Sequence, residues 1–149
     1  TPGTLLLAMA PPTCRAVLLG NSIRGAEGQC EGLLRALGFP AHELVRVRRE
    51  SSVFTLGYWS RLLPASLHLL LHSSGLLPID APTRDAAARA AGTDTRPTLV
   101  VASGRDTVAA AAEARRRAPE STMVVQVQHP RCDFSAFDLV CIPKHDLPP

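Results

Sequence analysis

The sequence predicts an open, parallel α/β sheet of the Rossmann-like class, with helices on both faces. Three segments share one pattern, in which an apolar strand runs directly into a polar loop that carries glycine or histidine: residues 16–25, 99–106 and 124–131. Helical patterns follow the first two, as in the strand–helix–strand units of parallel sheets. Hydrophobic residues make up 46% of the chain but aromatic residues only 4%, so the core must consist of leucine, valine and alanine.

The first third of the chain has the order strand, helix, strand. Residues 16–19 form an apolar run typical of a buried strand, and residues 26–37 repeat apolar side chains at helical spacing. Gly38 is placed to end this helix in a left-handed conformation, and Pro40 prevents the helix from resuming. Residues 43–47 alternate between apolar and other side chains, which predicts a strand with one face near solvent, as at a sheet edge.

The middle of the chain is harder to assign. Residues 57–72 form a leucine-rich helical pattern, in which Pro64 either kinks the helix or restarts it as a first-turn proline. One face of this pattern is expected to pack in the core, because no strongly basic opposite face supports a membrane-surface helix. That face carries Trp59, Leu63, Leu67 and Leu70. Residues 73–97 are expected to be an internal linker or surface excursion around a short alanine helix at residues 85–91.

The alternation of strands and helices then returns. The patterns predict a strand at residues 98–102, a helix at 107–117, a strand at 122–127, a loop with at most one helical turn, and a strand at 138–142. Right-handed crossovers would join these strands into one sheet of about five parallel strands. The arginines at 115–117 are expected to be a solvated helix end, where cations complement the last carbonyls.

The length of 149 residues indicates one domain, predicted here at residues 15–149, with an N-terminal extension at 1–14. A domain of this size buries about two-thirds of the surface of its unfolded chain. The opening residues carry no positive charge, so we expect no signal peptide. The leucine-rich run at residues 62–71 is shorter than the roughly 20 apolar residues of a spanning helix, so no transmembrane segment is expected.

Charge and cysteine content narrow the function classes. The formal net charge of +3 and the pI of 8.9 are mild, and the basic residues are spread along the chain, which argues against a nucleic-acid partner. The four cysteines include no C-x-x-C pair, as is typical of reduced intracellular thiols.

Polar side chains gather where the predicted strands end. The carboxyl ends of parallel strands lie at one edge of a sheet, and ligands of open α/β sheets bind in the crevice there. Backbone N–H groups at the helix starts near Gly25 and Gly104, together with arginine side chains, could receive an anion in this crevice. The candidate anion-binding residues are Gly20, Arg24, Gly25, Ser103, Gly104, Arg105, Asp106, His129, Arg131, Lys144 and His145.

The first of these loops has two interpretations. It does not match G-x-G-x-x-G, because Ser22 stands where the second glycine is required, and it does not match a P-loop, because Ala26 and Glu27 follow Gly25. Either the helix start and Arg24 receive an anion, or the glycines only permit a tight turn and close helix packing.

The second loop contains the strongest single candidate. Ser103 and Asp106 have the spacing of a capping box, which would explain both residues without a ligand. Arg105 is not explained in this way. Its guanidinium group suits bidentate capture of a phosphate or carboxylate, or an ion pair with Asp106 or Asp146.

The histidines do not define a catalytic centre. His129 could act as an acid or base, donate a hydrogen bond to a phosphate, or satisfy loop carbonyls. His129, His145, Asp106 and Asp146 lack the short spacing of metal ligands, and a set of Ser103, His129 and Asp146 lacks a nucleophile elbow. We therefore predict no catalytic residue, no metal and no cofactor.

Four motifs at consistent spacing carry a family resemblance. They are Gly-Asn-Ser-Ile-Arg-Gly-Ala-Glu-Gly-Gln-Cys-Glu-Gly-Leu at residues 20–33, Val-Ala-Ser-Gly-Arg-Asp-Thr at 101–107, Val-Gln-His-Pro-Arg at 127–131 and Phe-Asp-Leu-Val-Cys-Ile-Pro-Lys-His-Asp at 137–146. In this order they resemble the plant mitochondrial-fission family named for its elongated-mitochondria mutant, whose bacterial relatives are labelled predicted nucleoside-diphosphate-sugar epimerases. The resemblance covers residues 15–146.

The resemblance implies a function that the residues alone do not show. It implies a non-catalytic, peripheral adaptor on the cytosolic face of the mitochondrial outer membrane, which helps recruit a dynamin-related GTPase for fission. It also implies that this chain is similar to the N-terminal lobe of a two-lobed, glycosyltransferase-like fold whose C-terminal lobe is absent, as in a fragment, a short isoform or a truncated gene product. The alternative is the N-terminal lobe of a glycosyltransferase-like or nucleotide-sugar enzyme. We expect this chain by itself to bind a phosphate or nucleotide-sugar anion only weakly, because a single lobe leaves one side of the ligand in water.

Overall fold

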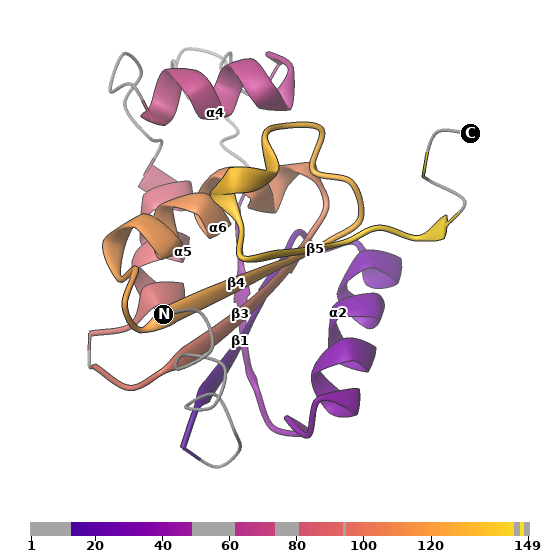
Figure 1. The fold of residues 1–149 in the computed structure, drawn as a ribbon, viewed down its shortest axis with the longest axis vertical. Coiled ribbons are helices and arrows are strands. Elements are labelled where there is room, and N and C mark those ends of the chain that lie inside the picture. The colour runs from indigo at the N-terminus through magenta and orange to yellow at the C-terminus, as the bar shows by residue number, and fades with distance from the viewer. Residues whose placement is uncertain (1–12, 49–61, 74–80, 94, 145–146, 148–149) are drawn as a thin grey trace.

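The computed structural model describes residues 13–48, 62–73, 81–93, 95–144 and 147, and it forms one five-stranded sheet (Figure 1). All neighbouring strands are parallel, in the order β2-β1-β3-β4-β5. The predicted α/β class and the predicted parallel strands are therefore confirmed. The strands are β1 (Arg15–Gly20), β2 (Glu43–Arg46), β3 (Thr98–Ser103), β4 (Thr122–Val127) and β5 (Leu139–Cys141).

Helices cover both faces of the sheet. They are α2 (Arg24–Ala36), α4 (Ala65–Ser73), α5 (Ala81–Ala91) and α6 (Arg105–Arg117), with one 3₁₀ turn, η1 (Phe134–Ala136). Figure 1 shows α2 on one face, α5 and α6 on the other, and α4 outside α6. No helix in these described ranges is long and apolar enough to cross a membrane.

Alternate residues of the strands belong to two core clusters, one on each face of the sheet. On the α2 face, Leu18 and Val101 pack with Cys30 and Leu34 of the helix. On the opposite face, odd-numbered residues of β1 such as Val17 pack with alanines of α5 and α6. The side-chain period of 2 in strands explains this division, because successive residues of one strand point to opposite faces.

Helix α2 ends as the sequence predicts. Gly38 has a φ of 88°, in the left-handed region, and its N–H donates to the Arg35 carbonyl while the Phe39 N–H donates to the Leu34 carbonyl. This pair of bonds is a Schellman motif, which satisfies two carbonyls of the last turn. Phe39 and Leu34 also share the core cluster on this face, so the cap is fixed by packing as well as by hydrogen bonds.

Strand β2 lies at the sheet edge, as its alternating pattern predicts. Val45 is fully buried and Val47 is 4% exposed, whereas Leu44 is 38% exposed. The strand pairs with β1 through the register Leu18↔Leu44 and Gly20↔Arg46. β2 is the terminal strand of the sheet order, and the exposure of Leu44 agrees with this edge position.

Helix α4 differs from the sequence prediction for residues 57–72. The helix begins after Pro64, whose carbonyl accepts the N–H of His68, so proline marks a helix start rather than a kink within the described residues. The expectation of core packing is wrong for Leu67 and Leu70, which are 40% and 61% exposed. Trp59 lies outside the described residues. Leucines at helical spacing do not by themselves show whether another part of the fold covers that face of the helix. Here α4 packs on α6 and lies outside both core clusters.

The segment expected to be a linker contributes to the core instead. Helix α5 is longer than the expected alanine helix, and Ala86, Ala87, Ala90 and Ala91 are all buried against the sheet and α6. Alanine has a small side chain, so it gives a weak hydrophobic signal, but it lets a helix approach a neighbouring helix closely.

The three arginines at the end of α6 form ion pairs and are not simply a solvated helix end. Arg115 donates to Asp138 (3.0 Å), while Arg116 and Arg117 both donate to the carboxylate of Glu113. Burial would raise the pKa of Glu113, but the two guanidinium groups outweigh it and hold the pKa below its usual value.

Candidate functional site

The topology itself creates a crevice between β1 and β3. These strands are neighbours, but α2, which follows β1, lies on one face, while α6, which follows β3, lies on the other (Figure 1). The two connecting loops therefore diverge above the carboxyl ends of the strands. This is the topological switch point, the usual ligand position in open α/β sheets with the strand order 2-1-3-4-5.

A cavity of about 530 Å³ occupies this switch point. It is bounded by the starts of α2 and α6 and by the end of β4. We call it the switch-point crevice. Its lining residues are Asn21, Ile23, Gly25, Ala26, Gln29, Gly104, Arg105, Asp106 and Gln128.

Each strand that reaches the crevice is followed by a left-handed residue. Ser22 after β1 has a φ of 64°, Gly104 after β3 has 86°, and Gln128 after β4 has 72°. Only glycine adopts this region without a steric cost, so Ser22 and Gln128 hold strained conformations. Surrounding bonds fix both: Glu27 accepts the Ser22 N–H (2.9 Å), and the Gln128 side chain donates to Gln29 (3.0 Å).

The loop between β1 and α2 is held by a carboxylate. Asn21 accepts the Ile23 N–H in an Asx turn, and Glu27 accepts two hydrogen bonds from Arg46 as well as the one from Ser22. The Arg46 guanidinium holds the pKa of Glu27 below its ordinary value. Gly20 is required here by space, because a Cβ at that position would lie 2.3 Å from a Glu27 carboxylate oxygen.

The loop between β3 and α6 contradicts the predicted capping box. Ser103 belongs to β3, and Gly104 is the N-cap residue, with no side-chain cap. The Ser103 hydroxyl is buried near the Cys30 thiol and makes no hydrogen bond of normal geometry to a described residue. Burial raises the pKa of Cys30 to about 12. The prediction failed because the strand continues one residue further, which turns the serine side chain into the core.

Arg105 lies where the sequence predicts, at the start of α6. Its side chain lines the switch-point crevice, and its guanidinium donates to the carbonyl of Leu63, next to the proline that precedes α4. Arg105 thus joins the crevice loop to the start of α4, a contact that sequence patterns did not indicate.

The predicted site residues fall into two groups. Gly25, Gly104, Arg105 and Asp106 line the crevice. The others do not line it, although those that are described lie at the carboxyl ends of strands or in the segments that follow them. Gly20 lies beside Glu27, Arg24 opens α2 with an exposed side chain, Ser103 is buried, Lys144 is exposed after β5, and His145 lies outside the described residues.

His129 and Arg131 share the loop after β4. The Nδ1 atom of His129 accepts the Arg131 N–H (2.9 Å), and its ring packs edge-on against Phe134 with ring centroids 5.3 Å apart. Both side chains are exposed. The histidine therefore organises its own loop, but by accepting a backbone N–H and not by satisfying loop carbonyls.

Sequence reasoning missed several lining residues: Asn21, Ile23, Ala26, Gln29 and Gln128. Gln29 lies one helical turn after Gly25 and could have been found from that spacing. Gln128 could not, because the left-handed turn that brings it to the crevice leaves no mark in the sequence. Among the residues that the structure describes, no group of three or more His, Cys, Asp or Glu side chains is arranged to hold a metal ion.

Comparisons with known proteins identify the family. Residues 24–149 match the family described as Mitochondrial fission ELM1. The chain is similar to Mitochondrial fission protein ELM1 of Arabidopsis thaliana, with 34% identity over 170 aligned positions that cover 91% of this chain and 39% of the relative. The chain thus spans about two-fifths of the length of this curated relative, and no solved structure matches it. Since the family match covers most of the chain, including the loop between β3 and α6, this chain belongs to the mitochondrial fission ELM1 family.

Proposed function

We propose that this chain is a sheet domain of a mitochondrial fission factor, acting as a non-catalytic adaptor that helps recruit a dynamin-related GTPase to the cytosolic face of the mitochondrial outer membrane. The observation that carries the proposal is the family match, which extends from the start of α2 to the end of the chain. In this role the domain is the N-terminal lobe of a longer factor, and it associates with the membrane peripherally.

The fold supports the adaptor role over catalysis. The polar groups near the switch-point crevice are largely engaged with one another: Glu27 with Arg46 and Ser22, Gln128 with Gln29, and Arg105 with a backbone carbonyl. Catalysis requires preorganised groups directed at a reacting atom. The described crevice contains no such arrangement around a nucleophile, so we assign it no catalytic residue.

A second candidate function is weak binding of an anion, such as phosphate or a nucleotide sugar, in the switch-point crevice. The crevice supports this candidate because two helix starts, those of α2 and α6, and the Arg105 side chain converge on a cavity of about 530 Å³. Helix starts favour anions through their N–H groups. The proposed contacts are Gly25, Gly104 and Arg105, with Arg24, His129, Arg131 and Lys144 as neighbours at the same edge. His145 is proposed from the sequence pattern alone.

A chimera tests the adaptor role. The matching segment of the Arabidopsis relative is replaced by this chain, and mitochondrial length and co-purification of the dynamin-related GTPase are measured in cells that lack the relative. We expect normal mitochondrial length and recovery of the GTPase. A chimera that is expressed and folded but leaves the mitochondria elongated would contradict the proposal.

Calorimetry with UDP-glucose separates the adaptor role, with or without weak anion binding, from the enzyme-lobe alternative. We expect millimolar binding or none. Micromolar binding, about −8 kcal/mol, that is lost in Arg105→Ala would instead favour the enzyme-lobe alternative. The matched control is Arg35→Ala, which removes the same charge from the last turn of α2, at the other end of the sheet.

A further inference from the structure

A second concave surface lies at the free edge of the sheet, beside β2. Its volume is about 740 Å³. It runs from the loop after β1, along β2, to the side chain of an α5 residue. We call it the edge groove, and its lining residues are Asn21, Ser22, Ile23, Leu44, Arg46, Val47, Arg48 and Arg89.

The backbone of β2 has one hydrogen-bonding side unused by the sheet. β2 is the terminal strand and pairs with β1. The Val47 N–H donates to the Gly20 carbonyl (2.9 Å), so odd-numbered residues here bond toward β1. Because backbone groups alternate along a strand, the N–H and C=O groups of Leu44 and Arg46 point away from the sheet. Such an edge can accept an additional strand.

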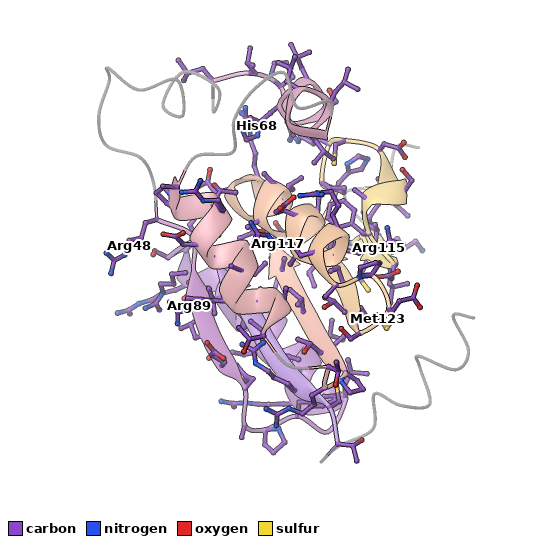
Figure 2. All side chains as sticks on the ribbon, turned by 90° about the vertical axis from the view of Figure 1, so that its left-hand side faces the viewer. Arg48, His68, Arg89, Arg115, Arg117 and Met123 are labelled. Carbon is purple, nitrogen blue, oxygen red and sulfur yellow. The ribbon has the colours of Figure 1, made fainter. Side chains whose placement is uncertain are left out.

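The edge groove is positively charged. Three guanidinium groups line it, those of Arg46, Arg48 and Arg89, and no carboxylate among the described residues does. Glu27 bonds to Arg46, and Glu43 lies 3.5 Å from Arg89. The side chains of Arg46 and Arg89 are nevertheless 53% and 62% exposed. Figure 2 shows Arg48 and Arg89 projecting from the same side of the molecule.

Apolar positions accompany these charges. Ile23 is 51% exposed and Leu44 is 38% exposed, and both line the edge groove. A strand that adds to an edge uses main-chain hydrogen bonds for affinity and presents alternate side chains to pockets on each face. Leu44 and Arg46 lie on the same face of β2, whereas Arg89 comes from α5 on the opposite face. A segment in which acidic residues alternate with apolar residues can therefore present its apolar side chains toward Leu44 and its acidic side chains toward Arg89.

We propose that the edge groove binds an acidic, extended segment of a partner protein, which adds to β2 as a further strand. The inference rests on the proposed adaptor function and names the surface that the adaptor uses. A protein segment is favoured over an anionic membrane because the groove is concave and offers backbone groups of a strand that no other strand of the described sheet pairs with, which a lipid surface cannot use.

Fluorescence anisotropy on the whole chain tests the proposal. The probe is a short fluorescein-labelled peptide in which glutamate and valine alternate. We expect saturable binding that weakens as salt rises, because exposed charge pairs are screened. Arg48→Ala and Arg89→Ala should each weaken binding roughly two- to fivefold, the range expected for loss of one exposed ion pair. Arg35→Ala is the matched control and should leave binding unchanged.

Hydrogen exchange provides a second readout that a purely electrostatic contact would not change. We expect the amides of Leu44 and Arg46 to exchange more slowly when the glutamate–valine probe is bound, since strand addition would engage them. A probe of alternating glutamate and proline, which lacks half of the backbone donors, should bind more weakly.

Three results would overturn the proposal. The first is that a lysine–valine peptide binds as tightly as the glutamate–valine peptide. The second is that the Arg48→Ala and Arg89→Ala variants bind the glutamate–valine peptide as tightly as the native chain. The third is that the chain binds phosphatidylserine vesicles but not the peptide. None of these results depends on the chimera experiment. If the edge groove does not bind the peptide but the chimera restores mitochondrial length, the partner surface lies elsewhere. If the groove binds the peptide but the chimera leaves the mitochondria elongated, the fission role is rejected.

Discussion

At the residue scale, two glycines of one motif have opposite roles. A Cβ at Gly20 would lie 2.3 Å from a Glu27 oxygen and 3.1 Å from the Leu44 side chain, whereas a Cβ at Gly28 in α2 would meet nothing within 4 Å. The Glu27 oxygen cannot simply move away, because Arg46 and the Ser22 N–H hold it. Gly20 is therefore required by packing, and Gly28 is not.

This difference gives a matched pair of substitutions. We expect Gly20→Ala to lower the free energy of unfolding by about 1–3 kcal/mol, the usual cost of overpacking. Gly28→Ala should raise it by about 0.5–1 kcal/mol, because alanine is the better helix residue. Urea denaturation of both variants checks this prediction. Equal stability of the two variants would show that the Glu27 side chain relocates without cost.

At the element scale, one ion pair joins helix α2 to the edge strand β2. Arg46 donates to both carboxylate oxygens of Glu27, at 3.1 and 3.0 Å. These bonds hold the pKa of Glu27 below its ordinary value of 4.5. Similar pairing lowers the pKa of Glu43, through Arg15 and Arg89. Both pairs tie β2 to neighbouring elements, so they affect the same edge of the sheet.

The lowered pKa predicts the direction of the pH dependence. A carboxyl group whose pKa is lower in the folded state contributes stability above its unfolded pKa, and this contribution disappears as the pH falls through the folded pKa. The melting temperature of the native chain should therefore decrease as the pH is lowered below about 4.5. The melting temperature of Glu27→Gln should decrease less steeply over the same pH interval. Glu120→Gln, which removes an exposed charge near the end of α6, is the control. Parallel curves for the native chain and Glu27→Gln would contradict the assignment.

The leucines of α2 and α4 also differ at this scale. Leu34 of α2 is fully buried, whereas Leu70 of α4 is 61% exposed. We expect Leu34→Ala to cost about 2–5 kcal/mol in unfolding free energy, through lost burial and a cavity. Leu70→Ala should change it by no more than about 0.5 kcal/mol. Chemical denaturation checks both values, and a large loss for Leu70→Ala would mean that α4 stabilises the core.

At the scale of the whole molecule, the two core clusters share one sheet. Neighbouring residues of the same strands feed both clusters, so neither face can lose its packing while the other keeps its strands. A single domain of this kind is expected to unfold in one cooperative transition. The helices of the two faces are thus coupled through the strands between them.

A local probe on the α2 face and a probe of the whole molecule together test this cooperativity. Cys30 is fully buried on the α2 face, and burial raises the pKa of its thiol to about 12, so native-state alkylation should be slow. We expect its labelling by iodoacetamide and the loss of far-UV circular dichroism to share one denaturant midpoint. Labelling of Cys30 at a clearly lower denaturant concentration would show that α2 detaches independently.

How far the fold follows from sequence depends on the hydrophobic pattern. The strands, the end of α2 at Gly38 and the edge position of β2 were predictable, because each is encoded by residues close together in the chain. Helix α5 was not, because alanine gives little periodic signal and only packing on α6 shows that the helix is buried. For the crevice, Arg105 and the helix starts were predictable from the strand–loop–helix order, whereas Gln128 was not.

The sequence by itself determined the parallel α/β class, the order of the elements, and the set of loops that meet at one edge of the sheet. It did so because local periodicity and turn residues fix each element, and parallel topology then brings the strand ends together. The tertiary structure alone decided that Ser103 points into the core, that Glu27 and Arg46 pair across two elements, and that α4 leaves Leu67 and Leu70 exposed. These features depend on contacts between residues far apart in the chain, or on the absence of a covering surface, and neither leaves a periodic mark in the sequence.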